Sequence, residues 1–425
     1  MTDMVEINGL LILFLILFAV TALCRWLLTR LNIRHLRRHG HEIPEVFRGD
    51  IDGATLARIT DYTIESSRVR SFEQAVDDLF VLLILLSGFL PWLLSVVLLL
   101  DLPFVPSGLL FLGAVVVLSA LTGIPFALYN TFVIEKRHGF STITLRLWLT
   151  DLMKGIALSA SLMAVLLGSL LFIVQYGPQT WWFWAWVLFA LFQLLLLWLF
   201  PVVIAPFFNR FEPVRDRALK DTLVAIMSRV GLKTEGVYQI DEGKRTRHTN
   251  AYFTGLGKTK RIVLFDTLLA SHRHDEIASV LAHEIGHWQK RHILKQLVLT
   301  KVASLCLFYL AYRLTGWPPL YRTFGFDEAV PYVGLLLLGM LSGPLFFLLS
   351  PLGAVIARTF EREADDFAVG LMGTGRPFTD ALRRLAKDNL ANLHPHPLYA
   401  WFHYSHPPLA ERIARIEQMK TPAAS

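Results

Sequence analysis

Residues 275–315 read DEIASVLAHEIGHWQKRHILKQLVLTKVASLCLFYLAYRLT, a polar stretch that runs directly into an apolar one. The apolar part is close to the ~20 residues that a helix needs to cross a bilayer. The polar part contains the HExxH pattern His283-Glu284-Ile285-Gly286-His287. Because residues four apart lie on one face of a helix, His283 and His287 can bind one zinc ion. Glu284 is then the candidate general base that takes a proton from a water.

The charges around this motif suit a helix. Asp275 and Glu276 lie at the expected start, and Lys290, Arg291 and His292 lie on the far side of the motif. Acidic residues stabilise the first turn of a helix and basic residues stabilise the last. A chance pattern on an ordinary amphipathic helix is the alternative, since five-residue motifs arise by accident. The choice therefore depends on the rest of the chain.

The composition is that of a multi-pass membrane protein. The chain has 425 residues, of which 54% are hydrophobic and 18% charged, with a net charge of +7. Soluble domains carry about 25% charged residues. Basic loops next to a lipid bilayer explain the charge, and without a nucleic-acid-binding motif we expect no nucleic-acid partner. Cys24 and Cys306 lie in apolar segments, so we expect neither a disulfide framework nor a cysteine zinc site.

Seven apolar runs approach the length of a membrane span, which predicts a mainly α polytopic protein. The third run is long, and we expect Pro125 to kink it. The predicted spans are residues 8–28, 79–100, 105–132, 156–175, 181–204, 296–315 and 331–357.

The loops between the spans carry unequal charge. Residues 25–78 contain nine arginines and residues 135–155 contain four basic residues, whereas residues 101–104 and 175–180 contain none. Since basic loops face the cytoplasm, we expect the N-terminus outside and the basic loops inside.

This orientation places the HExxH helix and the C-terminal region in the same compartment. Together they would form one cytoplasmic α+β zinc metallopeptidase domain that a membrane hairpin interrupts. The predicted divisions are residues 1–205 for spans one to five with their loops, 206–295 for the first part of the peptidase, 296–357 for the hairpin of spans six and seven, and 358–425 for the second part.

A zinc peptidase site needs a third protein ligand and an open position. The candidates follow the last span in RTFEREADDFA, residues 358–368, an expected helix with acidic residues at 361, 363, 365 and 366. Glu361 and Asp365 share a face, so one can bind zinc while the other receives the free N–H of a zinc-bound histidine. A solvated acidic face is the alternative. Because the HExxH motif is expected on the same side of the membrane, we favour the metal site over the solvated acidic face.

The chain resembles the type I CAAX prenyl endopeptidases, seven-helix integral-membrane zinc metalloproteases of the gluzincin group. The resemblance implies that Glu361 is the third ligand, that Asp365 receives the histidine N–H, and that Glu363 has neither role. It also implies one Zn²⁺ per chain and a large chamber enclosed by the seven helices, with the zinc at its cytoplasmic end. The blocks that carry it are EKRHGF (135–140), NAYFTG (250–255), HEIGHW (283–288), FEREADDFA (360–368) and YSHPPL (404–409).

Residues 248–255 and 261–265 predict a short strand, a turn and a second strand. An exposed strand edge beside HExxH can hold an extended peptide through main-chain hydrogen bonds. A similar Asn-Ala strand binds the substrate backbone in gluzincins, so the resemblance makes Asn250, Ala251 and Tyr252 candidate substrate contacts. An ordinary hairpin with asparagine at a turn is the alternative.

His406 precedes two prolines, which predict extended chain before a helix over residues 409–419. The resemblance makes His406 the residue that stabilises the oxyanion, with Arg412 as an oxyanion-binding or ligand-orienting cation. On residue type alone, such a histidine is more often a surface or capping residue. We interpret His272, His274 and His292 as helix-end or surface histidines. The EKRHGF block either supports the catalytic part or anchors a loop.

The resemblance implies a protease that removes the C-terminal tripeptide after a prenylated cysteine. One alternative is a quality-control protease of the HtpX type, which clears misfolded membrane proteins. A site-2-type intramembrane protease is disfavoured because the polar residues 289–292 directly follow the motif. A transporter or scaffold with a zinc site is a further alternative, although the spans contain few ionisable residues. The compact polar insertions favour a bacterial inner membrane over the endoplasmic reticulum.

Overall fold

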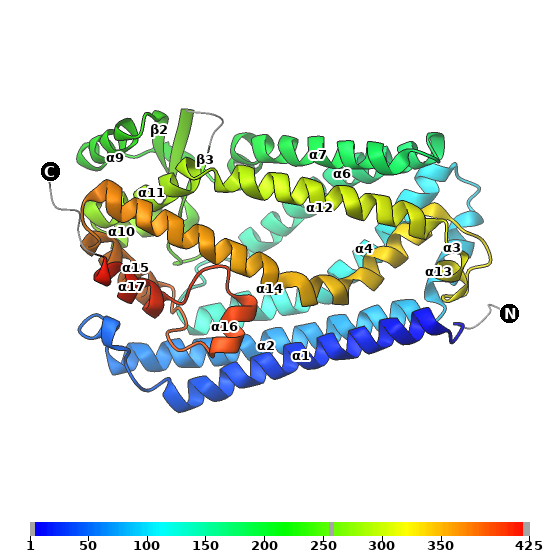
Figure 1. Cartoon of the computed structure of the whole chain (residues 1–425), viewed down its shortest axis with the longest axis horizontal. Helices are drawn as coiled ribbons and strands as arrows, with labels where there is room; N and C mark the ends of the chain where they lie inside the picture. Colours follow the sequence, from blue (N-terminus) through cyan, green and yellow to red (C-terminus); the bar gives the residue numbers. More distant parts are fainter. Residues whose placement is uncertain (1–4, 255–258, 420–425) are drawn as a thin grey trace.

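The structure is a computed structural model that describes residues 5–254 and 259–419, so Gly255 of the NAYFTG block lies outside the described residues. The molecule is elongated, and its long helices run roughly along its length (Figure 1). The sheet and most of the short polar helices gather at one end, where the C-terminus also lies. The N-terminus lies at the opposite end. We call these the sheet end and the far end.

The membrane-spanning character predicted from the sequence is confirmed. Among the described residues, six helices are long and apolar enough to cross a bilayer, and a bent helix pair brings the number to as many as seven. The six begin with α1 (Gly9–His39), α4 (Phe104–Tyr129), α6 (Leu145–Tyr176), α7 (Trp181–Leu199), α12 (His292–Thr315) and α14 (Pro331–Met372).

The second predicted span, residues 79–100, is not one straight helix. It falls on the end of α2 (Gly53–Leu86) and on α3 (Phe89–Leu98), which bend by 60° at their junction. Gly88 lies at this break with a φ of 76°, a left-handed conformation that glycine adopts without steric cost. Continuous hydropathy in the sequence hides this break.

The third predicted span is irregular toward its end. Pro125 lies inside α4, and a π-helical turn at Asn130–Ile134 leads into the short α5 (Glu135–Arg137). Proline removes a backbone donor and π turns occur where the helical hydrogen-bond ladder is disturbed. The irregular part therefore lies directly before the EKRHGF block.

The long helices contact one another in a closed ring. In the described part of the chain, α1 packs against α2, α2 against α4, α4 against α6 and α6 against α7. The ring continues from α7 to α12, from α12 to α14 and from α14 back to α1. These helices bury little of their surface: the most apolar window of α7 contains no buried residue. Each helix thus contacts its two neighbours in the ring, and α4 also contacts α14.

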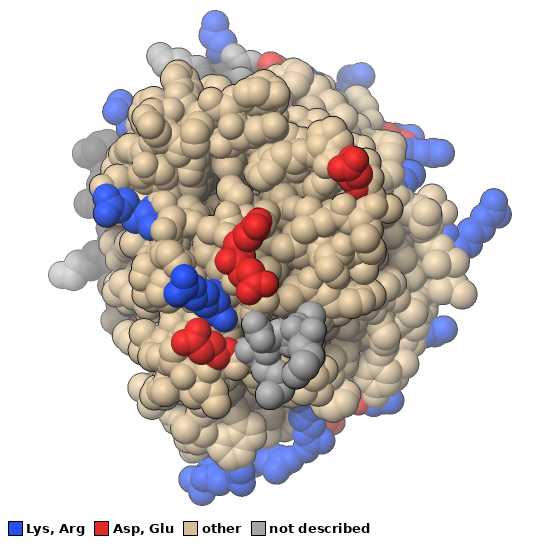
Figure 2. Space-filling model, turned by 90° about the vertical axis from the view of Figure 1, so that its right-hand side faces the viewer, with Lys and Arg blue, Asp and Glu red and all other residues tan. Residues whose placement is uncertain are grey.

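The far end of the ring is closed by a hydrophobic cluster. Phe111 of α4 packs against Tyr332 of α14, with ring centroids 5.6 Å apart, and Tyr321 of α13 (Pro318–Arg322) is buried beside them. The Asn8 amide donates a hydrogen bond to the Thr323 hydroxyl at 2.7 Å, which fixes the start of α1 to this cluster. Figure 2 shows this end: most of the face is uncharged, and its lysines and arginines lie mainly around the rim.

The sheet end contains the predicted strand pair within a larger sheet. The described strands are β1 (Phe211–Pro213), β2 (Lys233–Ile240), β3 (Ala251–Thr254) and β4 (Thr259–Phe265), in the order β1-β2-β4-β3. β3 pairs with β4 antiparallel, as predicted, whereas β2 pairs with β4 in parallel, which the sequence did not indicate. β3 therefore forms one edge of the sheet.

The helices of the sheet end pack in two hydrophobic clusters. The first joins the sheet to α9 (Arg217–Arg229), α10 (Asp266–Ser271) and α11 (His274–Gln289). The second joins α15 (Arg376–Asp388) and α17 (Leu409–Gln418) to residues 47–59, before and at the start of α2. A short helix, α16 (Pro397–His403), packs beside α14 and α1. The C-terminal part thus contacts the N-terminal segment as well as the HExxH helix.

Candidate metal centre

The HExxH motif lies on α11, whose first turn carries acidic residues as the sequence predicted. The Glu276 carboxylate accepts a hydrogen bond from the backbone N–H of Arg273 at 2.8 Å, and this closes the start of the helix. Glu276 is fully buried and also pairs with Arg384 at 3.1 Å. The helix ends at Gln289. Arg291 has a left-handed φ of 57°, and α12 begins at His292.

The two helices that carry the candidate ligands cross at Gly286. A Cβ atom at this position would lie 2.9 Å from the Ala364 Cα on α14, closer than side-chain atoms tolerate. The absence of a side chain therefore allows α11 and α14 to approach backbone to backbone. This approach brings Glu361, one turn before Ala364, opposite His283 and His287.

His283, His287 and Glu361 converge on one point. Within the described part of the chain, their ligand atoms lie within 4.8 Å of one another. The two Nε2 atoms are 3.2 Å apart, and Glu361 lies 3.4 Å from His283 and 3.3 Å from His287. The Glu361 Oε2 atom is buried without a hydrogen-bond partner. Two imidazole nitrogens and a carboxylate with an unused buried oxygen are a donor set that fits a zinc ion.

Asp365 lies behind the first histidine. The His283 Nδ1 donates to Asp365 Oδ1 at 2.8 Å, which leaves Nε2 free for a metal. Arg412 donates two hydrogen bonds to the same carboxylate, at 2.8 Å and 2.6 Å. Burial disfavours the Arg412 charge, but the bonds to Asp365 outweigh it and raise the pKa of Arg412, which stays cationic. The two acidic residues left open by the sequence thus occupy different places: Glu361 faces both histidines, and Asp365 supports one of them.

Glu284 and His406 lie beside the cluster. Glu284 is half-buried on α11, next to His283. His406 lies in the connection between α16 and α17, with its Nε2 3.3 Å from Glu361 Oε1 and 61% of its side chain exposed. Ser405 contacts the other ring nitrogen at 3.0 Å. His406 is therefore at the solvent side of the cluster, whereas Arg412 is buried behind it.

The candidate substrate strand lies next to the HExxH helix. β3 contacts α11 and pairs with β4 along one side. The Phe265 N–H donates to the Asn250 carbonyl at 3.1 Å, so the alternating antiparallel pattern turns the Ala251 backbone toward the unpaired edge. There the Ala251 N–H is satisfied by the Asn250 side chain at 2.8 Å. Tyr252 packs near Phe200, with ring centroids 6.4 Å apart.

The EKRHGF block supports the segment that leads into β3. Phe140 stacks on His248 with ring centroids 3.9 Å apart, and the Phe140 carbonyl accepts from the Arg247 N–H at 3.0 Å. Glu135 accepts from the Tyr62 hydroxyl at 2.6 Å and lies 3.2 Å from His248. Of the two interpretations left open, the structure favours support of the catalytic part.

Two histidines interpreted as helix-end or surface residues are buried. His272 is 6% exposed and His292 is 1% exposed, so the surface alternative is wrong for both, whereas the helix-end alternative is right for His272, which caps the end of α10. His292 does begin a helix, but its ring contacts His287. His274 alone of the three is well exposed, and it pairs with Asp216 at 2.8 Å. In the sequence, the available clue to this contact was that His292 follows His287 by five residues. The clue was not sufficient, because on a continuous helix this spacing points the two side chains apart.

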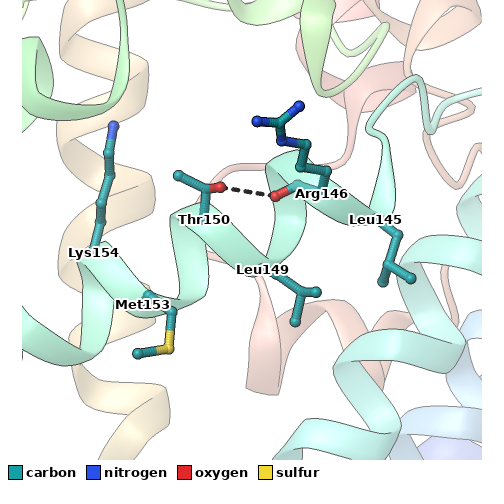
Figure 3. A pocket seen from close by; sticks show the side chains of 6 residues that line it. All are labelled: Leu145, Arg146, Leu149, Thr150, Met153 and Lys154. Atoms are coloured by element: carbon teal, nitrogen blue, oxygen red, sulfur yellow. Dashed lines mark hydrogen bonds between the residues drawn. The ribbon is translucent and has the colours of Figure 1, made fainter.

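An open surface pocket of about 610 Å³ lies along the first turns of α6 and is lined by none of these residues. Figure 3 shows Arg146, Thr150 and Lys154 on one side of the helix and Leu145, Leu149 and Met153 on the other. Lys154 donates to the Phe207 carbonyl at 2.9 Å, so the polar side of α6 is bound to the chain that follows α7. The pocket is therefore lined by the amphipathic start of α6.

Comparison with known proteins covers nearly the whole chain. Residues 32–210 match the family described as CAAX prenyl protease N-terminal, five membrane helices, and residues 213–420 match peptidase family M48. The CAAX prenyl protease 1 homolog of Arabidopsis thaliana is 34% identical over 383 residues, which cover 88% of this chain and 90% of the relative. CAAX prenyl protease 1 of Saccharomyces cerevisiae is 34% identical over 405 residues, with 88% of each chain covered.

A solved structure has the same fold. The crystal structure of S. mikatae Ste24p superposes with a TM-score of 0.88 at 31% identity, over 97% of this chain and 100% of that chain. The similarity therefore includes both the helical ring and the sheet end.

Proposed function

The chain belongs to peptidase family M48, whose members include the CAAX prenyl proteases, and from this premise we propose that it binds zinc through His283, His287 and Glu361. It is a multi-pass membrane metalloprotease that acts like the CAAX proteases. The observation that carries the zinc assignment is the convergence of two Nε2 atoms on a carboxylate whose Oε2 has no hydrogen-bond partner. The Arg412 Nη2 atom lies 3.5 Å from this oxygen without a hydrogen bond to it, and a metal ion would give the buried oxygen a direct partner.

We propose the following roles for the residues around the metal. A zinc ion held by these residues would supply Lewis-acid activation of water and of the scissile carbonyl. Glu284 accepts the proton of the attacking water and passes it to the leaving amine. The accessible His406 ring donates a hydrogen bond to the oxyanion. Arg412 acts through Asp365 to hold His283, because its guanidinium donates two hydrogen bonds to that carboxylate.

We propose that β3 holds the substrate backbone. Its unpaired edge lies beside α11, and an extended peptide can add to such an edge as a further strand. The Ala251 N–H would then exchange the Asn250 side chain for a peptide carbonyl. Asn250, Ala251 and Tyr252 are the proposed substrate contacts.

We propose that the substrates are proteins with a prenylated C-terminal cysteine, cut after that cysteine. The names of the relatives support this class. The resemblance also implies a chamber enclosed by seven helices, and the long helices do contact one another in a ring. Such a chamber would have room for a lipid tail beside the metal. A quality-control protease of the HtpX type is the second candidate, since the same machinery would cut unprenylated membrane proteins.

We also propose that the metal site faces the cytoplasm. The arginine-rich residues 25–78, which form the end of α1, the connection and much of α2, contribute residues 47–59 to the sheet end, whereas the far end in Figure 2 is poor in lysine and arginine over most of its face. Basic loops stay in the cytoplasm. We propose a bacterial inner membrane as the source membrane, because the polar insertions are compact. The two relatives described above are eukaryotic.

The test is cleavage of matched peptides, farnesylated and unmodified, by the purified full chain. We expect cleavage of the farnesylated peptide, loss of activity with a zinc chelator and recovery when zinc is added back. Glu284→Gln is expected to keep one zinc per chain while its turnover falls about 10²- to 10⁴-fold, the range for loss of a general base.

The other outcomes separate the alternatives. Equal cleavage of both peptides would favour the quality-control protease. One zinc per chain without hydrolysis of any peptide would favour a scaffold. Substantial turnover by Glu284→Gln would contradict the general-base role.

A further inference from the structure

The two candidate histidine ligands are supported in different ways. His283 donates directly to a carboxylate, Asp365, at 2.8 Å. The Nδ1 atom of His287 instead lies 3.0 Å from the Nδ1 atom of a third histidine, His292. The other nitrogen of His292, Nε2, lies 3.0 Å from the Glu363 Oε2 atom. A carboxylate therefore supports each ligand, but the second acts through an intervening ring.

The break between α11 and α12 makes this contact possible. His287 and His292 are five residues apart, and on a continuous helix their side chains would point in different directions. Arg291 has a φ of 57°, a costly conformation for a residue with a side chain. The turn it forms places His292 at the start of α12, facing back toward His287. The strained backbone at Arg291 is therefore what places His292 beside His287.

The His292 ring is held on all sides. It is 1% exposed and stacks on Phe360, with ring centroids 4.3 Å apart and planes 11° apart. Lys295 lies over the same phenylalanine and 3.6 Å from Glu363. Phe360 and Glu363 flank the ligand Glu361 on α14, so the helix that supplies the third ligand also fixes this histidine.

The hydrogen bonds allow one consistent arrangement of protons. His287 must present an unprotonated Nε2 to a metal, so its proton is on Nδ1. Because two Nδ1 atoms 3.0 Å apart share one proton, His287 donates and His292 accepts. The proton of a neutral His292 is then on Nε2, where it is donated to Glu363. The opposite direction would leave His287 with a protonated Nε2 that cannot bind a metal.

We propose that His292 and Glu363 are positioning residues, which fix the orientation and tautomer of His287 for zinc. This inference rests on the proposed zinc site. It gives Glu363 a role that the acidic pattern of α14 alone did not indicate, and it makes Arg291 the backbone feature on which that role depends. Groups that orient a metal ligand raise metal affinity about 10- to 100-fold.

The test compares two substitutions that separate hydrogen bonding from packing. His292→Phe keeps an aromatic ring against Phe360 but leaves the His287 N–H without an acceptor. His292→Asn loses the stacking but places an amide oxygen where Nδ1 was, so it can still accept from His287. His274→Ala on α11 is the matched control, because this exposed histidine pairs with Asp216 instead.

The readout is the zinc dissociation constant of the full chain in detergent, measured by competition with a chromogenic chelator, together with the visible spectrum of the cobalt(II)-substituted protein. We expect zinc binding to weaken about 10- to 100-fold in His292→Phe and clearly less in His292→Asn, with His274→Ala unchanged. The cobalt spectrum should shift in His292→Phe. Glu363→Gln, which keeps an acceptor without the charge, should weaken binding to an intermediate extent.

Two results would overturn the inference. One is a zinc affinity of His292→Phe within twofold of the unsubstituted chain, and the other is His292→Asn binding zinc more weakly than His292→Phe, which is the order that packing alone predicts. If the unsubstituted chain bound no zinc, the proposed metal site would itself be wrong. If the unsubstituted chain bound zinc and His292→Phe bound it with the same affinity, the zinc site would stand and only the positioning role would be rejected.

Discussion

Among single residues, Asp365 shows how the site holds a buried charge. It is 0% exposed, and its partners are His283 and the two donors of Arg412. A buried carboxylate is tolerated when it is paired and fully hydrogen-bonded, and it is costly when one partner is removed. The ligand geometry at His283 therefore depends on Arg412, whose Nη2 atom also lies 3.5 Å from the Glu361 Oε2 atom.

Arg412→Met tests this dependence. The substitution keeps a long side chain but leaves Asp365 without its cation, so we expect the free energy of unfolding to fall by about 3–5 kcal/mol. Zinc affinity should fall with it. The measurements are chemical denaturation and zinc competition on the full chain in detergent. Reduced turnover with unchanged stability and zinc affinity would instead assign Arg412 to the oxyanion, the other role that the resemblance implies.

Residue-level prediction from the sequence succeeded where the spacing was regular. The faces of a continuous helix bring His283 near His287 and Glu361 near Asp365, and the structure has both arrangements. It failed at His292, because that contact depends on a left-handed backbone at Arg291, which residue type does not indicate. The separate places of Glu361 and Asp365 also come from the crossing of two helices, which is a tertiary property.

Among secondary-structure elements, the crossing of α11 and α14 decides whether a site exists. The two helices approach at Gly286 and Ala364, and the ligands lie within one turn on either side of this contact. Since their separation there is set by a missing side chain, a change of one carbon atom should alter the ligand distances.

Gly286→Ala is expected to destabilise the protein and weaken zinc binding. The new Cβ would meet the backbone of Ala364 at 2.9 Å, and overpacking of this kind costs about 1–3 kcal/mol. The midpoint of thermal unfolding and the zinc dissociation constant are the measurements. Gly370→Ala on α14 is the control, because its Cβ meets nothing within 4 Å and should leave stability unchanged or raise it. Equal behaviour of the two variants would contradict the close-approach argument.

The elements themselves were predictable to different degrees. Apolar length located the membrane helices, because the bilayer imposes that length. It could not show the 60° bend between α2 and α3, since both sides of the bend are equally apolar. The pairing of β3 with β4 is local and was predicted, whereas the parallel pairing of β2 with β4 joins strands separated by β3 and leaves no local signal.

For the whole molecule, α14 joins the membrane to the site. It has 42 residues, which corresponds to about 63 Å of helix against a hydrocarbon core of about 30 Å. Its apolar part belongs to the ring, and its polar end carries Glu361. We expect a tilt of this helix in the membrane to move Glu361, although Pro344 and Pro351 lie between the first turns of the helix and that residue.

We expect activity to depend on bilayer thickness. Mismatch costs fractions of a kcal/mol per Å and is relieved by helix tilt, so a few Å should change turnover by about fivefold. The measurement is peptide cleavage in vesicles of monounsaturated phosphatidylcholine with 14, 18 or 22 carbons per chain. This series covers about the range of thickness of typical bilayers. Zinc content should stay constant across the series. The same turnover at every chain length would show that α14 does not couple the membrane to the site.

The position of the ligands along the chain also affects biosynthesis. A ribosome makes His283 and His287 before the α12–α14 hairpin, and makes Glu361, His406 and Arg412 after it. A growing chain thus has the HExxH helix in place while the proposed third ligand does not yet exist. The complete set forms only when both helices of the hairpin have been inserted and the last helices have been made. The order of translation alone should therefore keep the half-made protease inactive.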